Sequence, residues 1–125
     1  MFLGLRTTVY FVNDLPAARD WYARVLEATP YFDTPYYVGF SVGGFELGLH
    51  PAEDGRAPGL GGHAAYWGVL DAEAAHARLI ALGATSLQAP HDVGGGIVVG
   101  AVTDPFGNEL GIIFNPHFGK ATPEA

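Results

Sequence analysis

The chain contains no cysteine. This absence excludes disulfide bonds, thiolate metal ligands and a cysteine nucleophile from the chemistry of the protein. A chain that needs no disulfide also suits a reducing compartment. We therefore expect a cytoplasmic protein.

Basic side chains are scarce, because 6 Lys and Arg residues stand against 13 Asp and Glu residues and give a formal net charge of −7. Such a composition offers no positively charged surface that could bind a phosphate backbone, which argues against nucleic acid as a partner. The first residues lack a basic segment followed by a long apolar one, and no apolar run approaches the roughly 20 residues of a membrane helix. We expect no signal peptide and no membrane partner.

What the chain does have is enough apolar material for one folded domain, with 125 residues of which 49% are hydrophobic. Within this single domain, residues 1–125, two half-modules echo each other at about 5–50 and 63–116, and a Gly- and Pro-rich linker joins them at 51–62. The echo is clearest where Glu46-Leu47-Gly48 in the first half matches Glu109-Leu110-Gly111 in the second.

Each half predicts the order strand, helix, strand, strand, strand. Apolar runs indicate first strands at 5–12 and 64–69, and Asp14 and Asp71 follow them as helix N-caps. Gly43-Gly44 predicts a hairpin turn between strands at 36–42 and 45–50, and residues 97–103 and 109–114 form the matching pair. Weaker strands are expected near 31–32 and 85–88. Helices on one face of a sheet define an α+β class with a concave sheet.

The stretch from Asp104 to Asn108 is typical of a β-turn that feeds a strand. Together with the residues after it, this stretch resembles the Asp-Pro-x-Gly-Asn-x-x-Glu motif of the vicinal oxygen chelate superfamily. That superfamily includes glyoxalase I, extradiol dioxygenases, fosfomycin resistance enzymes and bleomycin resistance proteins. The resemblance covers about residues 6–116. It implies two paired βαβββ modules that form a concave, partly closed mixed sheet around a cavity.

The resemblance also implies a divalent metal held by four side chains, one on the first strand and one on the closing strand of each half. In this chain those positions fall on Thr7, Gly48, Ala64 and Gly111. Threonine is a poor ligand for such an ion, and alanine and glycine offer no side-chain donor at all. We therefore expect no metal and no cofactor.

Strand alternation identifies the side chains that share a face with these positions. Phe11 and Tyr66 would form flat apolar walls of a pocket, and Glu46 and Glu109 would be acceptors in it or else solvated strand ends. The predicted ligand-binding residues are Thr7, Phe11, Glu46, Gly48, His50, Tyr66, Glu109 and Gly111. No residue is singled out as catalytic, because the sequence gives no distance between the two glutamates.

These observations favour a small-molecule binding protein that sequesters an amphipathic or cationic compound, in the manner of bleomycin resistance proteins. A metal-dependent lyase, similar to lactoylglutathione lyase, an isomerase or a dioxygenase is the alternative, with His50, Glu46, Glu109 and His63 as displaced ligands. A third alternative is a dimeric interaction module. We also expect a homodimer, because members of the resembled superfamily commonly pair modules across chains.

Overall fold

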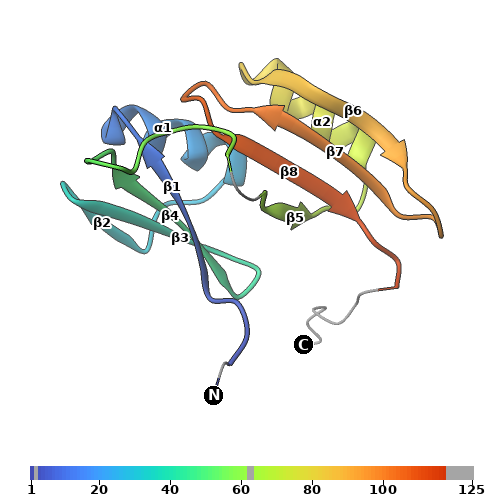
Figure 1. Ribbon diagram of the computed structural model, residues 1–125, viewed down its shortest axis with the longest axis horizontal. Coiled ribbons are helices and arrows are strands. Elements are labelled where there is room, and N and C mark those ends of the chain that lie inside the picture. The colour runs from blue at the N-terminus through green and yellow to red at the C-terminus, as the bar shows by residue number, and fades with distance from the viewer. Residues whose placement is uncertain (2, 62–63, 118–125) are drawn as a thin grey trace. The chain divides into compact units, whose positions relative to one another are not determined.

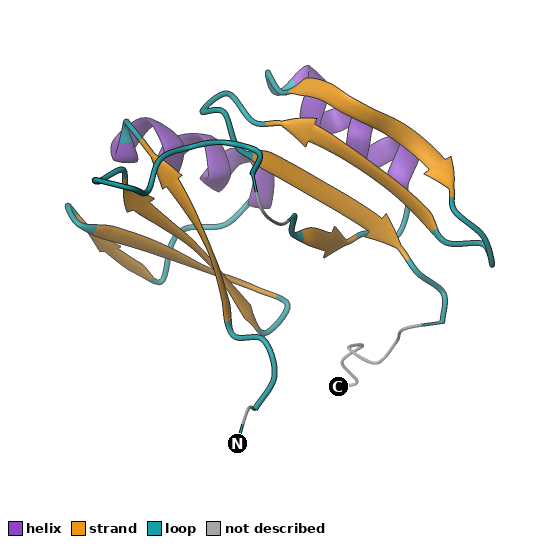
Figure 2. Ribbon diagram, viewed as in Figure 1, coloured by secondary structure: helices purple, strands orange, loops and turns teal. Residues whose placement is uncertain are grey.

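The computed structural model describes residues 1, 3–61 and 64–117. The chain divides into two compact units, residues 1–58 and 59–125, which we call unit 1 and unit 2. Each unit holds one βαβββ module (Figure 1). In each module a single helix lies against the sheet of its own unit (Figure 2).

Unit 1 consists of a four-stranded mixed sheet and one helix. The strands lie in the order β1-β4-β3-β2, with β1 parallel to β4 and the other neighbours antiparallel. The elements are β1 (Thr7–Val12), α1 (Leu15–Leu26), β2 (Phe32–Thr34), β3 (Tyr37–Val42) and β4 (Phe45–Pro51).

Local sequence signals set the ends of these elements. The Asp14 side chain accepts a hydrogen bond from the Ala17 amide at 3.0 Å and so caps the first turn of α1. The helix ends at Glu27, whose φ of 53° is left-handed. Between β3 and β4, Gly43 and Gly44 both have positive φ, 58° and 91°, which a two-residue hairpin turn of this kind requires.

The core of unit 1 lies between α1 and one face of the sheet. Trp21 and Tyr22 of α1 are 4% and 0% exposed, and Tyr22 stacks on Tyr10 of β1 with ring centroids 6.1 Å apart. The sheet contributes alternate residues to this core, as a strand with one buried face must. These residues are Tyr10, Val12, Val38, Phe40, Leu47 and Leu49.

Unit 2 repeats the architecture, with strands in the order β5-β8-β7-β6 and β5 parallel to β8. Its buried apolar residues are smaller, and they include Leu79 of the helix with Val102, Leu110 and Ile112 of the sheet. The elements are β5 (Tyr66–Gly68), α2 (Ala72–Ala81), β6 (Thr85–Asp92), β7 (Val98–Thr103) and β8 (Glu109–Phe114).

The turn between β7 and β8 is built around a buried carboxylate. One oxygen of Asp104 accepts hydrogen bonds from the amides of Phe106 and Asn108, both at 2.9 Å. The Asn108 side chain in turn accepts a hydrogen bond from the Gly59 amide at 3.0 Å. The motif recognised in the sequence therefore closes a hairpin and also fastens the first residue of unit 2 to its sheet.

The α+β class and the two βαβββ modules predicted from the sequence are confirmed. The strands of the described residues form two four-stranded sheets, one in each unit. Several boundaries differ from expectation: β1 begins at Thr7 rather than at residue 5, and β2 extends to Thr34. In unit 2, β5 is shorter than residues 64–69 and β6 continues to Asp92. No helix among the described residues is both long and apolar enough to cross a membrane.

Candidate functional site

The candidate site lies on the face of the unit 1 sheet that does not pack on α1. We call it the glycine face and define it by alternate residues of three strands. The pairing places Thr7 beside Glu46, Val9 beside Gly48 and Phe11 beside His50 across β1 and β4. Gly39 of β3 lies opposite Gly48. The full set is Thr7, Val9, Phe11, Tyr37, Gly39, Ser41, Glu46, Gly48 and His50.

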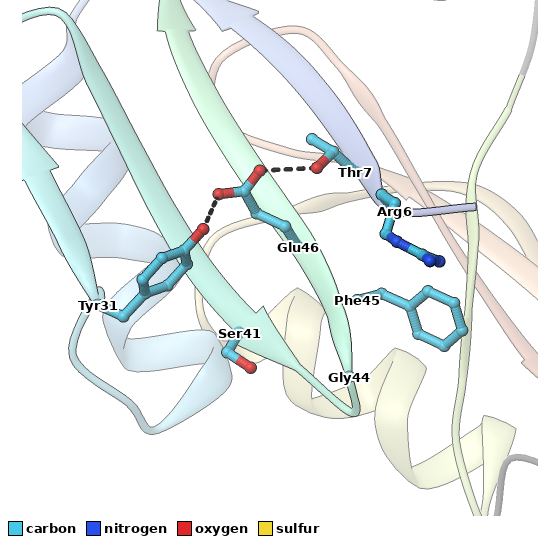
Figure 3. A pocket seen from close by; sticks show the side chains of 7 residues that line it. All are labelled: Arg6, Thr7, Tyr31, Ser41, Gly44, Phe45 and Glu46. Atoms are coloured by element: carbon cyan, nitrogen blue, oxygen red, sulfur yellow. Dashed lines mark hydrogen bonds between the residues drawn. The ribbon is translucent and has the colours of Figure 1, made fainter. Parts of the chain in front are cut away.

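The Glu46 carboxylate is the polar centre of this face and accepts three hydroxyl hydrogen bonds. Thr7 Oγ1 and the Tyr37 hydroxyl donate to Glu46 Oε1 at 2.7 and 2.8 Å. The Tyr31 hydroxyl donates to Glu46 Oε2. Figure 3 shows Thr7 of β1 and Tyr31, from the segment before β2, reaching this carboxylate from opposite sides. Donors from three segments therefore fix one negative charge in place.

These bonds decide the protonation state of the group. Burial alone would raise the pKa of Glu46, but the hydrogen bonds from Tyr31, Thr7 and Tyr37 outweigh it and lower the pKa below its ordinary value. Burial and the bond to Glu46 raise the pKa of Tyr37, and the bond to Glu46 raises that of Tyr31. Glu46 is thus a fixed anion and both phenols stay protonated, so the cluster binds and orients rather than exchanges protons near neutral pH.

Two glycines make room for this cluster. A Cβ atom on Gly39 would overlap a carboxylate oxygen of Glu46 and would stand 3.2 Å from Tyr31 Cε1. A Cβ atom on Gly48 would overlap the Tyr37 hydroxyl and would stand 2.7 Å from Tyr37 Cζ. Because the two glycines face each other across β3 and β4, the side chains of Glu46 and the tyrosines lie directly on the backbone.

The positions where the resemblance implies metal ligands do not fit a metal. The Tyr37 phenol fills the space above Gly48, and the Thr7 hydroxyl is already a donor to Glu46. A Cβ atom on Gly111 would stand 2.6 Å from the Ala65 carbonyl oxygen and 2.7 Å from Tyr66 Cδ1. Within residues 1, 3–61 and 64–117, no three His, Asp or Glu side chains group as a metal site would require.

Aromatic rings extend the glycine face beyond Glu46. The ring of His50 lies 5.3 Å from that of Phe11 and 6.3 Å from that of Tyr37, centroid to centroid. The guanidinium of Arg56 lies over the Phe11 ring at 5.6 Å. His50 Nδ1 lies 2.7 Å from the Pro51 carbonyl oxygen and donates to it, because a carbonyl oxygen can only accept. The result is a row of half-buried rings beside a carboxylate.

A shallow pocket of about 500 Å³ opens at one end of this face. It contains two of the predicted ligand-binding residues, Thr7 and Glu46. Its lining is Arg6, Thr7, Tyr31, Ser41, Gly44, Phe45 and Glu46 (Figure 3). Phe11, Gly48 and His50 lie on the same face of the sheet, outside this lining.

Unit 2 holds the remaining predicted residues. Tyr66 of β5 pairs with Gly111 of β8, is 45% exposed and covers that glycine with its ring. Glu109 is half-buried, and no hydrogen bond or ion pair to its carboxylate occurs in the described part of the chain. The structure therefore brings Thr7, Phe11, Glu46, Gly48 and His50 together in one unit. His63, an alternative metal ligand, lies outside the described residues.

Sequence reasoning missed two residues of the Glu46 cluster. Tyr37 shares a face with Gly39 by strand alternation, so the period of β3 could have identified it. Tyr31 carries no such signal, because it lies before β2 and reaches Glu46 only once β2 pairs with β3.

Two βαβββ modules in one chain, each with a glycine on its closing strand, define the class of fold to which the chain belongs. A family model described as the Glyoxalase/Bleomycin resistance protein/Dioxygenase superfamily matches residues 4–112. The chain belongs to that superfamily.

Solved structures of similar fold agree with this membership. A glyoxalase-related enzyme from Fulvimarina pelagi is 24% identical, with a TM-score of 0.76 and coverage of 92% of this chain and 90% of the other. The lactoylglutathione lyase from Agrobacterium tumefaciens is 18% identical, also with a TM-score of 0.76, over 95% of this chain and 98% of the other.

A superfamily member from Sphaerobacter thermophilus DSM 20745 is 23% identical, with a TM-score of 0.75 and coverage of 91% and 98%. At these identities the likeness concerns the fold. No curated protein matches the chain.

Proposed function

We propose that this protein binds a small organic molecule on the glycine face of unit 1 without using the divalent metal of its superfamily. The observation that carries the proposal is the position of Tyr37. Its phenol fills the space above Gly48 and donates to Glu46, so an aromatic and acidic surface stands where a metal ligand would have to project.

The chemistry of the surface suits an amphipathic or cationic ligand. Phe11, His50 and Tyr37 offer apolar ring area, and Glu46 supplies one oriented negative charge. A few placed polar groups among aromatic walls are typical of small-molecule sites. Sequestration, as in bleomycin resistance proteins, needs no further group. A reaction like that of lactoylglutathione lyase would need metal donors that the described residues do not bring together.

The test has two parts. Native mass spectrometry of freshly purified protein should detect a co-purifying small molecule, and titration calorimetry should find ligands in a panel of cationic, neutral and anionic aromatic compounds. Phe11→Ala, which removes one wall, should weaken the best ligand by about tenfold. Leu70→Ala, at an exposed position in unit 2, should leave affinity unchanged. If no compound binds, or if Phe11→Ala binds as well as the wild type, the proposal fails.

The part played by unit 2 is tested separately, at Glu109. Glu109→Gln keeps the shape and removes the charge. If Glu109 faces the ligand, this change should weaken a cationic compound by about 1–3 kcal/mol, the usual scale for a hydrogen bond to a charged group. Equal affinity of variant and wild type would make Glu109 a solvated strand end.

The remaining parts of the proposal concern the setting of the protein. A homodimer, a cytoplasmic location and the absence of nucleic-acid and membrane partners are proposed from the resemblance and from composition. The net charge of −7 supports the absence of a nucleic-acid partner, and the lack of cysteine suits a cytoplasmic location.

A further inference from the structure

Two tyrosine rings, Tyr31 and Tyr37, bond to the Glu46 carboxylate through their hydroxyls, and the ring of Phe32 contacts both of them. The ring centroids of Tyr31 and Phe32 are 6.5 Å apart with planes at 48°, and those of Phe32 and Tyr37 are 6.1 Å apart with planes at 56°. Rings stacked face to face would use up one another's surfaces. Here the ring planes are tilted, and Tyr31 and Phe32 remain 65% and 47% exposed.

The hydrogen bonds to Glu46 also orient the two tyrosine rings. A phenol hydroxyl donates roughly within the plane of its ring, so the bonds from Tyr31 and Tyr37 hold ring edges, and not ring faces, to the carboxylate. The face of an aromatic ring carries negative electrostatic potential and attracts cations. The aromatic rings and the Glu46 carboxylate therefore both contribute negative electrostatic potential in the same small region, and this potential favours a cation.

Among the described residues, no cationic side chain bonds to the Glu46 carboxylate. Arg19 forms ion pairs with Asp20 and Asp33, and neither pair involves Glu46. Arg6 lines the adjoining pocket, but its Nη1 donates to the Leu3 carbonyl oxygen, and its side chain extends toward Phe45 and away from Glu46 (Figure 3). The carboxylate is bonded only to neutral hydroxyls and keeps its negative charge for a ligand.

We infer that Tyr31, Phe32, Tyr37 and Glu46 form a cage for the quaternary or methylated ammonium group of a small organic cation. This inference rests on the proposed function and names its ligand class. A quaternary ammonium has no N–H to donate, so it gains nothing from neutral acceptors but is attracted by ring faces and by a carboxylate. The pocket of about 500 Å³ beside Glu46, with Phe45 and Ser41 in its lining, takes the rest of the molecule.

The test compares choline with 3,3-dimethylbutan-1-ol, which replaces the charged nitrogen by carbon and keeps the shape. In titrations followed by NMR of the full chain, choline should bind at least about tenfold more tightly than its neutral isostere, since both the carboxylate and the rings favour the cation. Equal binding of the two compounds, or tighter binding of the isostere, would overturn the inference.

Two variants test whether choline binds at the cage. Phe32→Leu removes one ring without touching a hydrogen bond to Glu46, and it should weaken choline by about fivefold while leaving the weak binding of the isostere unchanged. Tyr36→Leu is the matched control, because Tyr36 directly precedes β3, is 77% exposed and is not part of the cage. This variant should bind choline as the wild type does. An equal effect of both variants would overturn the cage.

The outcome separates this inference from the proposed function. If aromatic compounds of the panel bind at Phe11 but choline does not bind, the ligand class is wrong and the binding function stands. If neither binds, both are wrong. Glu46→Gln provides a last check, because it should reduce choline affinity at least as much as Phe32→Leu, and an unchanged affinity would remove the carboxylate from the site.

Discussion

Two positions without side chains, Gly39 and Gly48, determine what the glycine face can hold. Their missing Cβ atoms let Glu46, Tyr31 and Tyr37 lie against the backbone, where a larger residue would push them outward. The requirement comes from close approach, since neither glycine has a positive φ. The glycines and the hydroxyl bonds to Glu46 therefore depend on one another.

Gly48→Ala tests this dependence. The added methyl group would overlap the Tyr37 hydroxyl, so Tyr37 must turn away and lose its bond to Glu46. We expect a loss of about 1–3 kcal/mol in the free energy of unfolding, measured by urea denaturation. Gly68→Ala is the control, because nothing lies within 4 Å of its added Cβ atom, and it should change stability little. Equal stability of the two variants would contradict the packing described.

Glu46 should also make stability depend on pH in the acid range. Its folded-state pKa is lowered from the ordinary 4.5, so the folded state favours the ionised form. The resulting stability is fully present above about pH 4.5 and is lost as the pH falls through the folded-state pKa. Thermal unfolding between pH 6 and pH 3 should therefore show a steeper loss for the wild type than for Glu46→Gln. Parallel curves would mean that the hydroxyl bonds do not favour the anion.

At the scale of elements, each module begins its helix in the same way. Asp14 caps α1 through the Ala17 amide, and Asp71 caps α2 through the Ala74 amide, both at 3.0 Å. Each helix then covers one face of its sheet, so the cap fixes where the apolar stripe of the helix begins.

Removal of the first cap should be measurable. Asp14→Ala leaves an orphan amide in the first turn of α1, and we expect a loss of about 0.5–2 kcal/mol by chemical denaturation. Asp14→Asn retains a side-chain acceptor and should lose much less. Should both variants lose the same amount, the charge or another contact of Asp14 would be responsible rather than the cap.

At the scale of the whole molecule, the protein keeps the superfamily fold while its glycine positions carry tyrosine rings. Tyr37 covers Gly48 in unit 1, and Tyr66 covers Gly111 in unit 2. In both modules a tyrosine ring therefore lies over the glycine at the position of an expected metal ligand. The tyrosine comes from β3 in unit 1 and from β5 in unit 2.

We predict that the dialysed protein holds no stoichiometric divalent metal, because neither tyrosine-covered glycine offers a donor. Elemental analysis should find trace amounts only. About one equivalent of zinc, nickel, iron or manganese per chain, lost in His50→Ala or Glu109→Ala, would instead support the metal-dependent enzyme that the sequence left as an alternative.

We also predict a homodimer. Strand β6 is largely exposed, with Leu87 at 43%, and nearby Val93 is 53% exposed, so a second copy of the chain would find apolar surface to bury. Sedimentation at micromolar concentration should give about twice the chain mass of 13.2 kDa. A single species of one chain mass would remove the dimeric interaction module from consideration.

Much of this protein could be predicted from local sequence patterns. The period of two in Thr7-Thr8-Val9 and in Glu46-Leu47-Gly48 placed Thr7, Glu46 and Gly48 on one face, because strand geometry alone fixes that alternation. The caps at Asp14 and Asp71 and the turns at Gly43-Gly44 and Asp104 were readable for the same reason, since each acts within a few residues of itself.

Only the tertiary structure decided what stands over the glycines. Tyr31 and Thr7 lie 15 and 39 residues from Glu46, and their bonds to it exist only because β2, β3, β4 and β1 pair in one register. A sequence shows that glycine has no side chain, but it does not show which side chain from another segment packs over that position. The pairing of the strands determines which side chain packs there. In this protein it places Tyr37 over Gly48 and surrounds the Glu46 carboxylate with three hydroxyl donors.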